Sequence, residues 1–515
     1  MRRGQTRLWL SVFGVSLGLF AIRLLVPVPV AEADDKDGPR LMCGLGVTKV
    51  TGGHHPLYFR YPYFEYVSTP ACAGHAPYPT SEILPVELSR LLTPVLGLTG
   101  TINLIALGLL VCAIASAGIA TLVTGLRIRL WARLLLAAAV WLVVADASFF
   151  DVFATPFEEP AALTGLLLVA AGVVYLGRGW RATRLGLVVA GLGGFLAVLS
   201  KEQYLILAAP ICLTLVLASG DRRRVSSRPN ERSLGRGLQR YRSRQTGAAF
   251  LVAGALALMT ATYMVWDYTS HYGRRLHMIQ AVDLIFSRIV TTRANAPAAL
   301  RALGLPAAWI RYAGTYYWDT RSSVRHSPLF QQYVGKFNDL NIAHYLLTHP
   351  GRALSIGQVA AIQAQRFRIT TLGDYPVYAG HPKGALESRV AVLLWLVHQL
   401  PANAGLWLYL PLWVLLAALA IVALRWTGKP WHRDGAVLVL CMTGCALAAF
   451  IPPAYFAGIS TTRHMVGTNL ATALALIVGV ALAASMVRLA LTRDRARSTG
   501  ASQEPAAPEM LKPAP

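Results

Sequence analysis

Ten long apolar runs, separated by polar connections, constrain what this sequence of 515 residues can fold into. They lie at about residues 8–30, 95–124, 134–150, 160–176, 185–200, 203–219, 247–267, 404–424, 435–451 and 464–487. A helix needs about 20 mainly apolar residues to cross a bilayer. Only 14% of the residues are charged, which is low for a soluble protein. The sequence therefore predicts an all-α polytopic membrane protein with about ten transmembrane helices.

Basic residues cluster in the connections between these runs. The net charge of +24 would indicate a nucleic-acid partner in a soluble protein. Here the cations occupy alternate connections and the tail, at residues 127–133, 178–184, 222–244, 425–433 and 488–497. An excess of Lys and Arg marks cytoplasmic loops. We therefore predict a multi-pass protein of the cell membrane with cytoplasmic amino and carboxyl termini, whose partner is the lipid bilayer and not nucleic acid.

The other connections fall on the opposite, extracytoplasmic side. A large first outer loop spans 31–94, and a long outer segment spans 268–403. Apolar patches at 342–347 and 390–400 are too short to cross a bilayer and indicate interfacial helices. The basic block at 222–244 has almost no apolar residues and is predicted to be disordered. The predicted organisation is an N-terminal transmembrane module at 1–267, the outer segment at 268–403, C-terminal transmembrane helices at 404–490 and a disordered cytoplasmic tail at 491–515.

The first apolar run follows a positively charged amino end, which contains Arg2, Arg3 and Arg7. This run is too long for an ordinary signal-peptide core, so we interpret it as a membrane helix. A cleavable signal is the alternative, because the tripeptide at 31–33, Ala-Glu-Ala, matches the small-x-small cleavage pattern. The residues that follow lie on the outer side in both cases.

Two of the six cysteines, Cys43 and Cys72, share the first outer loop. An extracytoplasmic loop meets oxidising conditions, which favours a disulfide between them. Reduced, buried thiols are the alternative. The other four cysteines lie in apolar runs and are interpreted as core residues.

Three carboxylates, those of Asp34, Asp35 and Asp37, follow the first apolar run within four residues. At the outer end of a membrane helix they can face both water and a lipid headgroup. A carboxylate placed there can act as a general base. A solvated loop is the alternative reading, because blocks of charge are commonly just exposed.

A second acidic site, Asp151 with Glu158 and Glu159, lies between two apolar runs. Ionisable residues cost about 2.5–3.5 kcal/mol each at the centre of a membrane helix, so these lie at the water boundary or are retained for a function. Pro160 suits the first turn of the next helix. The two glutamates could therefore simply be a charged helix cap, favoured by the helix dipole.

Three cations stand at predicted outer helix ends, which runs against the positive-inside bias. They are Lys201 at the end of one run, and Arg463 and His464 at the start of the last. Such residues are candidates for binding an anion such as a phosphate. The alternative is that their long side chains snorkel to the membrane surface.

In the order of these sites the chain resembles the GT-C superfamily of polytopic glycosyltransferases. The resemblance rests on the Asp-Asp-Lys-Asp run at 34–37, followed by Arg40, and on the Phe-Phe-Asp-x-Phe-x-x-Pro-Phe-Glu-Glu-Pro-Ala run at 149–161. The latter is similar to an outer loop of bacterial hexose-transferase-like and protein O-mannosyltransferase-like members. Lys201, Arg463 and His464 look like the positions that these proteins use near the lipid phosphate.

The resemblance implies an enzyme that moves a hexose or pentose, with inversion, from a polyprenyl-phosphate donor to a glycan, lipid or protein acceptor. One of Asp34, Asp35 and Asp37 would be the general base, and the active site would be extracytoplasmic. No cofactor is required; a divalent metal is compatible with the acidic residues, but no spacing of metal ligands implies one. A transporter or flippase of a lipid-linked or polar solute is the main alternative, and a membrane scaffold without chemistry is the third.

Overall fold

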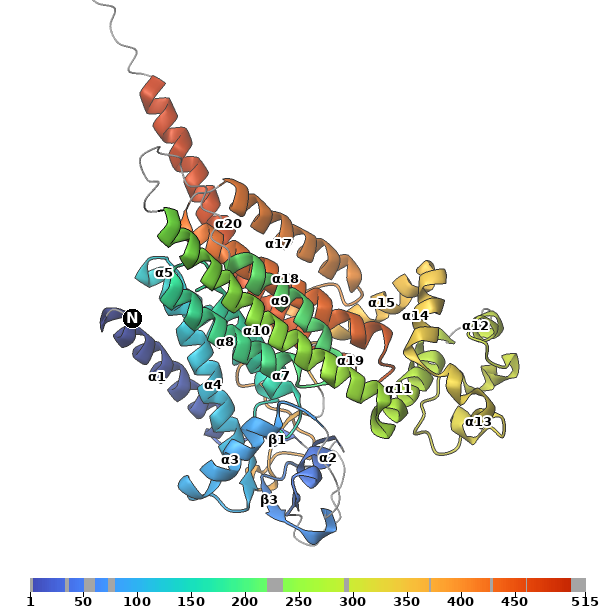
Figure 1. The fold of residues 1–515 in the computed structure, drawn as a ribbon. Coiled ribbons are helices and arrows are strands. Elements are labelled where there is room, and N and C mark those ends of the chain that lie inside the picture. Colours follow the sequence, from blue (N-terminus) through green and yellow to red (C-terminus); the bar gives the residue numbers. More distant parts are fainter. Residues whose placement is uncertain are drawn as a thin grey trace, which may run out of the picture.

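The computed structural model describes residues 3–32, 37–50, 61–72, 79–219, 235–290, 296–369, 372–426, 429–459 and 461–501. Long helices run side by side in a bundle, and smaller elements gather at one end of it (Figure 1). The start of the first helix and the end of the last lie together at the other end. We call these the outer end and the amino-terminal end of the bundle.

Within the described residues ten apolar helices form the bundle, as the sequence predicts. They are α1 (Arg3–Leu25), α4 (Leu104–Gly125), α5 (Leu130–Val144), α7 (Glu159–Val173), α8 (Trp180–Val198), α9 (Ala208–Ser219), α10 (Gly235–Thr269), α17 (Leu406–Trp426), α18 (Pro430–Tyr455) and α20 (Val466–Ala501). Eight are long and apolar enough to cross a membrane, where α9 is counted with the 3-10 turn η2 (Glu202–Leu207) that leads into it. The helices α5 and α7 are shorter. The chain is thus an all-α polytopic membrane protein.

Two helices extend further than the sequence indicates. The helix α10 begins at Gly235, inside the basic block predicted to be disordered, and residues 220–234 lie outside the described residues. The helix α20 continues to Ala501, so the first part of the predicted disordered tail is helical. Both extensions are polar and continue an apolar helix, which shows that an existing helix propagates into residues that would not nucleate one.

The first outer loop folds into a small α/β layer. Its elements are β1 (Ala31–Glu32), α2 (Asp37–Gly44), β2 (Val47–Lys49), β3 (Glu65–Ser68), the 3-10 turn η1 (Pro70–Cys72), α3 (Ile83–Val95) and β4 (Ile102–Asn103). The strands β2, β3 and β4 form an antiparallel sheet. A disulfide joins Cys43 of α2 to Cys72 of η1, so the bonded alternative is confirmed.

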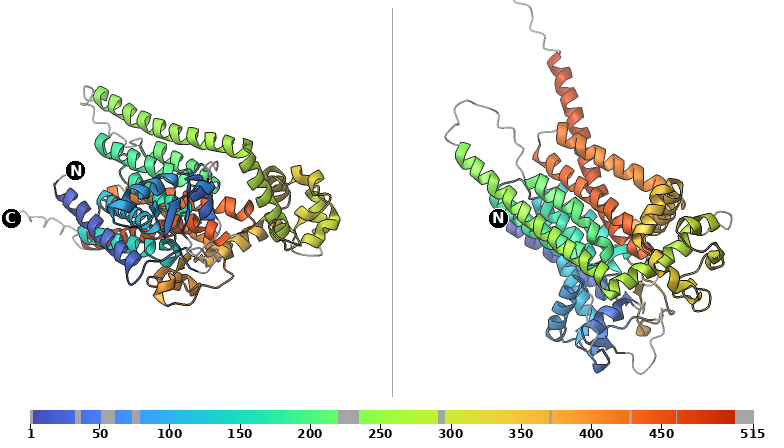
Figure 2. Two further views of the ribbon diagram at one scale, coloured as in Figure 1. Left: turned by 90° about the horizontal axis from the view of Figure 1, so that it is seen from below. Right: turned by 45° about the vertical axis from the view of Figure 1, so that its right-hand side comes forward.

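The long outer segment forms short helices beside this layer (Figure 2). They are α11 (His271–Leu284), η3 (Ile285–Ile289), α12 (Ala296–Ala302), η4 (Ala307–Tyr312), η5 (Val324–His326), α13 (Phe330–Tyr333), η6 (Val334–Lys336), α14 (Asp339–Thr348), α15 (Pro350–Gln365), η7 (Val377–Ala379) and α16 (Val392–His398). Phe286, Trp309 and Phe337 lie in the core of this segment. The helix α14 exposes Leu340 and Leu347, and α16 exposes Trp395, as expected for helices that lie on a bilayer surface.

The segment returns to the first loop through strand β5 (Leu372–Asp374). This strand pairs with β1 in an antiparallel ladder, in which Ala31 faces Asp374. Two short helices complete the chain, α6 (Ala147–Phe150) between α5 and α7, and α19 (Thr461–His464) before α20. The ladder places β1, the last described element before the acidic stretch, against the outer segment.

The helices α7 and α8 pack at very short range because small residues face each other. A Cβ added at Gly165 would lie 2.5 Å from the backbone nitrogen of Ala197 and 2.6 Å from the carbonyl oxygen of Gly193. Close backbone approach through small residues is a common way for membrane helices to associate. Since α7 begins at Glu159, this contact also fixes the position of the second acidic site.

We expect Gly165→Ala to destabilise the protein, because the added methyl group must push α7 and α8 apart. Overpacking of this kind costs about 1–3 kcal/mol. The measurement is the melting temperature of the purified protein in detergent. Gly254→Ala in α10 is the matched control, since a Cβ there meets nothing within 4 Å. Equal melting temperatures for the two variants would contradict the close contact.

Candidate functional site

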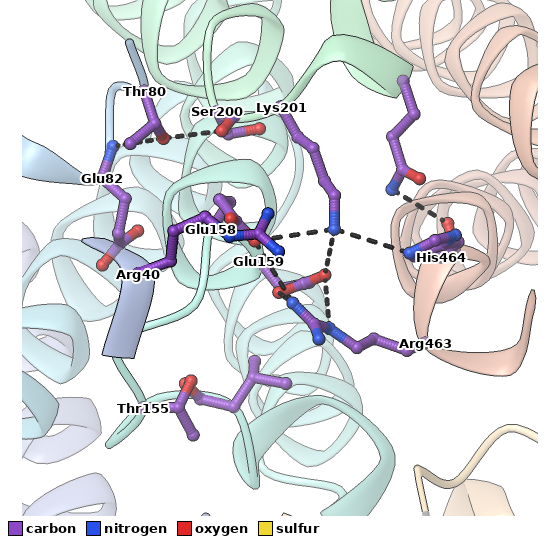
Figure 3. A network of polar contacts seen from close by, with 12 residues as sticks. Arg40, Thr80, Glu82, Thr155, Glu158, Glu159, Ser200, Lys201, Arg463 and His464 are labelled. Atoms are coloured by element: carbon purple, nitrogen blue, oxygen red, sulfur yellow. Dashed lines mark hydrogen bonds and ion pairs between the residues drawn. The ribbon is translucent and has the colours of Figure 1, made fainter. Parts of the chain in front are cut away.

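Four charged side chains, Glu158, Glu159, Lys201 and Arg463, meet at the outer end of the bundle, and we call them the outer charge cluster. The Nε of Arg463 donates to Oε1 of Glu159 at 2.9 Å, and its Nη2 donates to Oε2 of Glu158 at 3.2 Å. The Nζ of Lys201 lies 3.6 Å from an oxygen of each glutamate. All four side chains are buried and come from three separate segments (Figure 3). The sequence-predicted acidic and cationic sites are therefore one cluster.

Glu158 does not act as the helix cap that the sequence allowed. It occupies the N-cap position of α7, but its side chain makes no capping hydrogen bond. That role belongs to Glu82 of the first outer loop, whose Oε2 accepts the N–H of Ala161 at 2.7 Å. Burial raises the pKa of Glu82 well above its usual range, and the charge of Glu159 raises it further, although the hydrogen bond from Ala161 opposes both. Glu82 is not among the sequence-predicted site residues.

Two residues next to Glu82 tie the first outer loop to the turn that carries Lys201. The hydroxyl of Thr80 donates to the carbonyl oxygen of Ser200 at 2.6 Å (Figure 3). The hydroxyl of Ser81 donates to the carbonyl oxygen of Leu196 at 2.7 Å. These bonds fix the outer end of α8 and thereby the position of the Lys201 ammonium.

A cavity of about 360 Å³ adjoins the outer charge cluster, and we call it the outer cavity. Glu158, Lys201 and His464 line it, whereas Arg463 lies behind them, with its guanidinium 3.8 Å from the ring centre of Phe157. The Nζ of Lys201 is 3.5 Å from Nε2 of His464. Burial lowers the pKa of Lys201, but Glu158 and Glu159 outweigh this and raise it above its usual value. Lys201 therefore presents a permanent positive charge to the cavity.

Aromatic and acidic residues of α10 and α11 form the opposite wall. Tyr263, Trp266 and Tyr272 line the cavity, together with Trp318 from the outer segment. An aromatic face can pack against the apolar face of a ring-shaped ligand. This wall, which the sequence does not single out, gives the cavity room for an organic group beside the charges.

Asp267 and Asp283 also line the outer cavity. The Oδ2 of Asp267 lies 2.7 Å from Nε2 of His277, whose Nδ1 lies 2.8 Å from Asp339. Burial lowers the pKa of His277, but the hydrogen bonds to the two aspartates raise it to about 10, so the imidazole is charged and balances Asp267. Asp267 directly follows an apolar run, and this position could have marked it in the sequence.

Asp283 differs, because one of its oxygens faces no donor among the described residues. Its Oδ1 accepts the N–H of Tyr317 at 2.6 Å, while its Oδ2 is buried and makes no hydrogen bond within that part of the chain. Burial and the charge of Asp319 together raise the pKa of Asp283 to about 6, although the hydrogen bond from Tyr317 opposes this shift. An isolated aspartate within a helix carries no sequence signal for such a role.

The helix α2, which follows the acidic stretch in the sequence, borders this cavity. Asp34 and Asp35 lie outside the described residues, and so does the side chain of Asp37, the first residue of α2. Arg40, one helical turn further on, lines the outer cavity and donates from Nη1 to the hydroxyl of Tyr272 at 2.6 Å. The stretch therefore runs between strand β1 and a helix that contacts the cavity.

Asp151 is separate from Glu158 and Glu159, although the sequence groups them. It lies 3.9 Å from Nη2 of Arg23 and 3.2 Å from Nη2 of Arg368. Arg23 also pairs with the buried Glu387 of the outer segment. Burial raises the pKa of Asp151, and the neighbouring carboxylate of Glu387 raises it further. Asp151 thus joins α1 to the outer segment and does not line the outer cavity.

Among the described residues, no group of three or more His, Cys, Asp or Glu side chains could hold a metal ion. The two buried cysteines Cys441 and Cys445 lie in the core of α18. The lining of the outer cavity includes carboxylates, cations and aromatic rings.

A family model described as the YfdI N-terminal transmembrane domain matches residues 3–500. The chain belongs to this family. The match covers all ten apolar helices and every residue of the outer cavity. Curated proteins and solved structures gave no match.

We expect Arg463→Ala to destabilise the protein strongly, because it leaves Glu159 buried without its closest cation. Removing one partner of a buried ion pair costs about 3–5 kcal/mol. Melting in detergent measures the effect. The double variant Glu159→Gln/Arg463→Met, which removes both charges, should recover much of the loss. An Arg463→Ala protein as stable as the parent would show that the outer charge cluster is not a structural element.

The raised pKa of Asp283 predicts how stability depends on pH. A carboxyl group whose pKa rises on folding, here from 3.8 to about 6, favours the folded state at low pH and loses this contribution as pH increases through that window. Asp283→Asn cannot ionise, so its melting temperature should rise relative to that of the parent as pH increases from about 4 to 6. The difference between the two melting temperatures should then stay constant above about pH 6. Glu87→Gln on α3 is the control, since water already hydrates this half-exposed carboxylate. A gain that does not vary with pH would contradict the ionisation of Asp283.

Proposed function

We propose that the protein is a membrane glycosyltransferase of the GT-C type, which moves a sugar from a polyprenyl-phosphate donor to a glycan, lipid or protein acceptor. The observation that carries this proposal is the outer cavity at the outer end of the bundle, where cations, carboxylates and aromatic rings meet. In our proposal this end of the bundle lies at the membrane boundary. A lipid-linked donor needs this location, because its tail stays in the bilayer while its sugar reaches the surface.

The cations of the cavity are suited to the donor phosphate. Lys201 belongs to the outer charge cluster and lines the cavity, and Arg40, Arg275 and His464 line the same space. Lys and Arg stabilise phosphate through charge-assisted hydrogen bonds. In our proposal Arg463 acts indirectly, because it holds the two glutamates against which Lys201 is positioned.

The other wall would bind the sugar and the acceptor. Trp266 and Trp318 offer flat faces to a sugar ring, whose axial C–H groups are apolar. The Oδ2 of Asp283 can accept a hydrogen bond from a sugar hydroxyl. Sites built on hydrogen bonds to hydroxyl groups discriminate strongly against analogues that lack them. This wall would therefore contribute to the choice of sugar.

In the proposed reaction, one of Asp34, Asp35 and Asp37 takes the proton from the acceptor hydroxyl. The hydroxyl oxygen attacks the anomeric carbon from the face opposite the phosphate, so the configuration inverts. The bond from this carbon to the phosphate oxygen breaks, and polyprenyl phosphate leaves with both electrons. Lys201 and Arg40 would neutralise the charge that develops on the departing phosphate.

We further propose that the outer cavity is extracytoplasmic and that both termini are cytoplasmic. Support comes from Arg127 and Arg178, which lie in the α4–α5 and α7–α8 connections at the amino-terminal end of the bundle, and from Arg433 in the first turn of α18. An excess of such residues marks the cytoplasmic side. A transporter would need its charged site accessible from both sides in turn, whereas these groups lie at one end.

We expect Asp34→Asn or Asp37→Asn to lower turnover by about two to four orders of magnitude, because the amide cannot accept the proton. The assay uses the full chain in proteoliposomes with a radiolabelled polyprenyl-phosphate sugar and a membrane-glycan extract. Glu87→Gln in the same loop is the control, and melting temperatures verify folding. Activity within about threefold of the parent for both variants would refute this mechanism, since threefold is under 0.7 kcal/mol of barrier. A loss in Asp35→Asn alone would move the base to Asp35.

A further inference from the structure

A second group of charges lies at the amino-terminal end of the bundle, far from the outer cavity. Arg127 binds the carboxylate of Asp434 with two nitrogens, Nε and Nη2, each at 2.9 Å. The Nη2 of Arg178 reaches the same carboxylate at 2.5 Å, and its Nη1 donates to the carbonyl oxygen of Gly125. These contacts hold the α4–α5 and α7–α8 connections against the first turn of α18.

A pocket of about 290 Å³ opens beside these contacts, and we call it the amino-terminal pocket. Three arginines line it, Arg127, Arg133 and Arg178, together with the polar residues Gln5, Thr124 and Tyr175. The Asp434 carboxylate balances only one of the three positive charges. The pocket is large enough for a phosphate group with part of its ester, since the smallest ligand sites have about 300 Å³.

Two guanidinium nitrogens of the arginines that line this pocket have no acceptor within the described chain. The Nε atoms of Arg133 and Arg178 are buried and make no hydrogen bond to these residues. Burial also lowers the pKa of Arg178 to about 10, although Asp434 opposes this shift. A buried charged donor without an acceptor is costly, so the pocket favours an anion that can accept from both arginines.

We propose that the amino-terminal pocket binds the phosphate group of an anionic phospholipid from the adjacent leaflet. Arginine donates in a planar fork that matches phosphate oxygens. Arg133 and Arg178 would donate to the phosphate, while Asp434 keeps Arg127 and Arg178 in place. Basic pockets between transmembrane helices are known to hold such headgroups.

The surface beside Arg133 favours a lipid over free phosphate. The helix α5 exposes Leu130, Trp131 and Leu134 within one turn of Arg133. An acyl chain attached to a phosphate in the pocket could lie along these side chains, whereas inorganic phosphate would gain nothing from them. The membrane side of the pocket therefore matches the two parts of a phospholipid.

The test measures how many phosphatidylglycerol molecules the purified full chain retains in native mass spectrometry, after incubation with equal amounts of phosphatidylglycerol and phosphatidylcholine. We expect the parent to prefer phosphatidylglycerol and Arg133→Gln to lower its retention about tenfold. Arg129→Gln is the matched control: it removes the same charge about one helical turn before Arg133, but Arg129 is exposed and does not line the pocket. Arg133→Lys, which keeps the charge, should retain part of the preference.

Three results would overturn the proposal. The first is equal retention of both lipids by the parent protein. This result would overturn the proposal even if the Arg133 variants failed to fold. An equal loss in Arg129→Gln and Arg133→Gln would indicate general attraction between surface charges. Displacement of phosphatidylglycerol by inorganic phosphate at equal concentration would show that the pocket recognises a soluble phosphate and not a lipid.

Discussion

Arg463 lies between Glu158 and Glu159 at the outer end of the bundle, and the geometry of the outer cavity depends on this buried contact. Three of its hydrogen bonds to the glutamates are 2.9 to 3.3 Å long. The desolvation of a buried ion is costly, so such charges persist only where partners satisfy them. Because Arg463 satisfies the glutamates from behind, Lys201 can share them and still line the cavity. The ion pairs of the cluster thus join the start of α7 to α19 and fix the position of the Lys201 ammonium.

A second buried contact joins parts of the chain that are far apart in sequence. Arg23 near the end of α1 pairs with Glu387 of the outer segment, and its Nε donates to the carbonyl oxygen of Ala145 at 3.3 Å. Asp146 caps α6 and also accepts the N–H of Leu393 at 2.7 Å, which holds α16 against α6. Together with the β1–β5 ladder, these contacts fix the outer segment against the end of α1, strand β1 and helix α6. The site therefore combines the first outer loop with residues more than 200 positions later.

The transmembrane helices could be predicted from the sequence, whereas the contact partners of the charged residues in the site could not. Hydropathy finds α1 or α18 because a membrane helix satisfies its own backbone and needs only apolar side chains. The disulfide was predictable because Cys43 and Cys72 alone share an outer loop. In contrast, Asp151 and Glu158 are seven residues apart, yet they join different arginines, since the turn between α6 and α7 directs them apart. Asp283 gave no signal, because its environment comes from Tyr317 and from the cavity itself.

The two ends of the bundle differ in the balance between positive and negative side chains. At the outer end two carboxylates contact two cations, so the charges of the outer charge cluster are balanced without an external ion. A ligand can reach Lys201 only from the outer cavity. At the amino-terminal end three arginines line one pocket, and among the described residues Asp434 pairs with two of them, so an anion can balance the remaining positive charge. The arginines that mark the orientation of a membrane protein in its sequence can thus also form a binding site. Orientation depends on the summed charge of many connections, so a single change at Arg133 should leave it intact while it removes the contact to a phosphate.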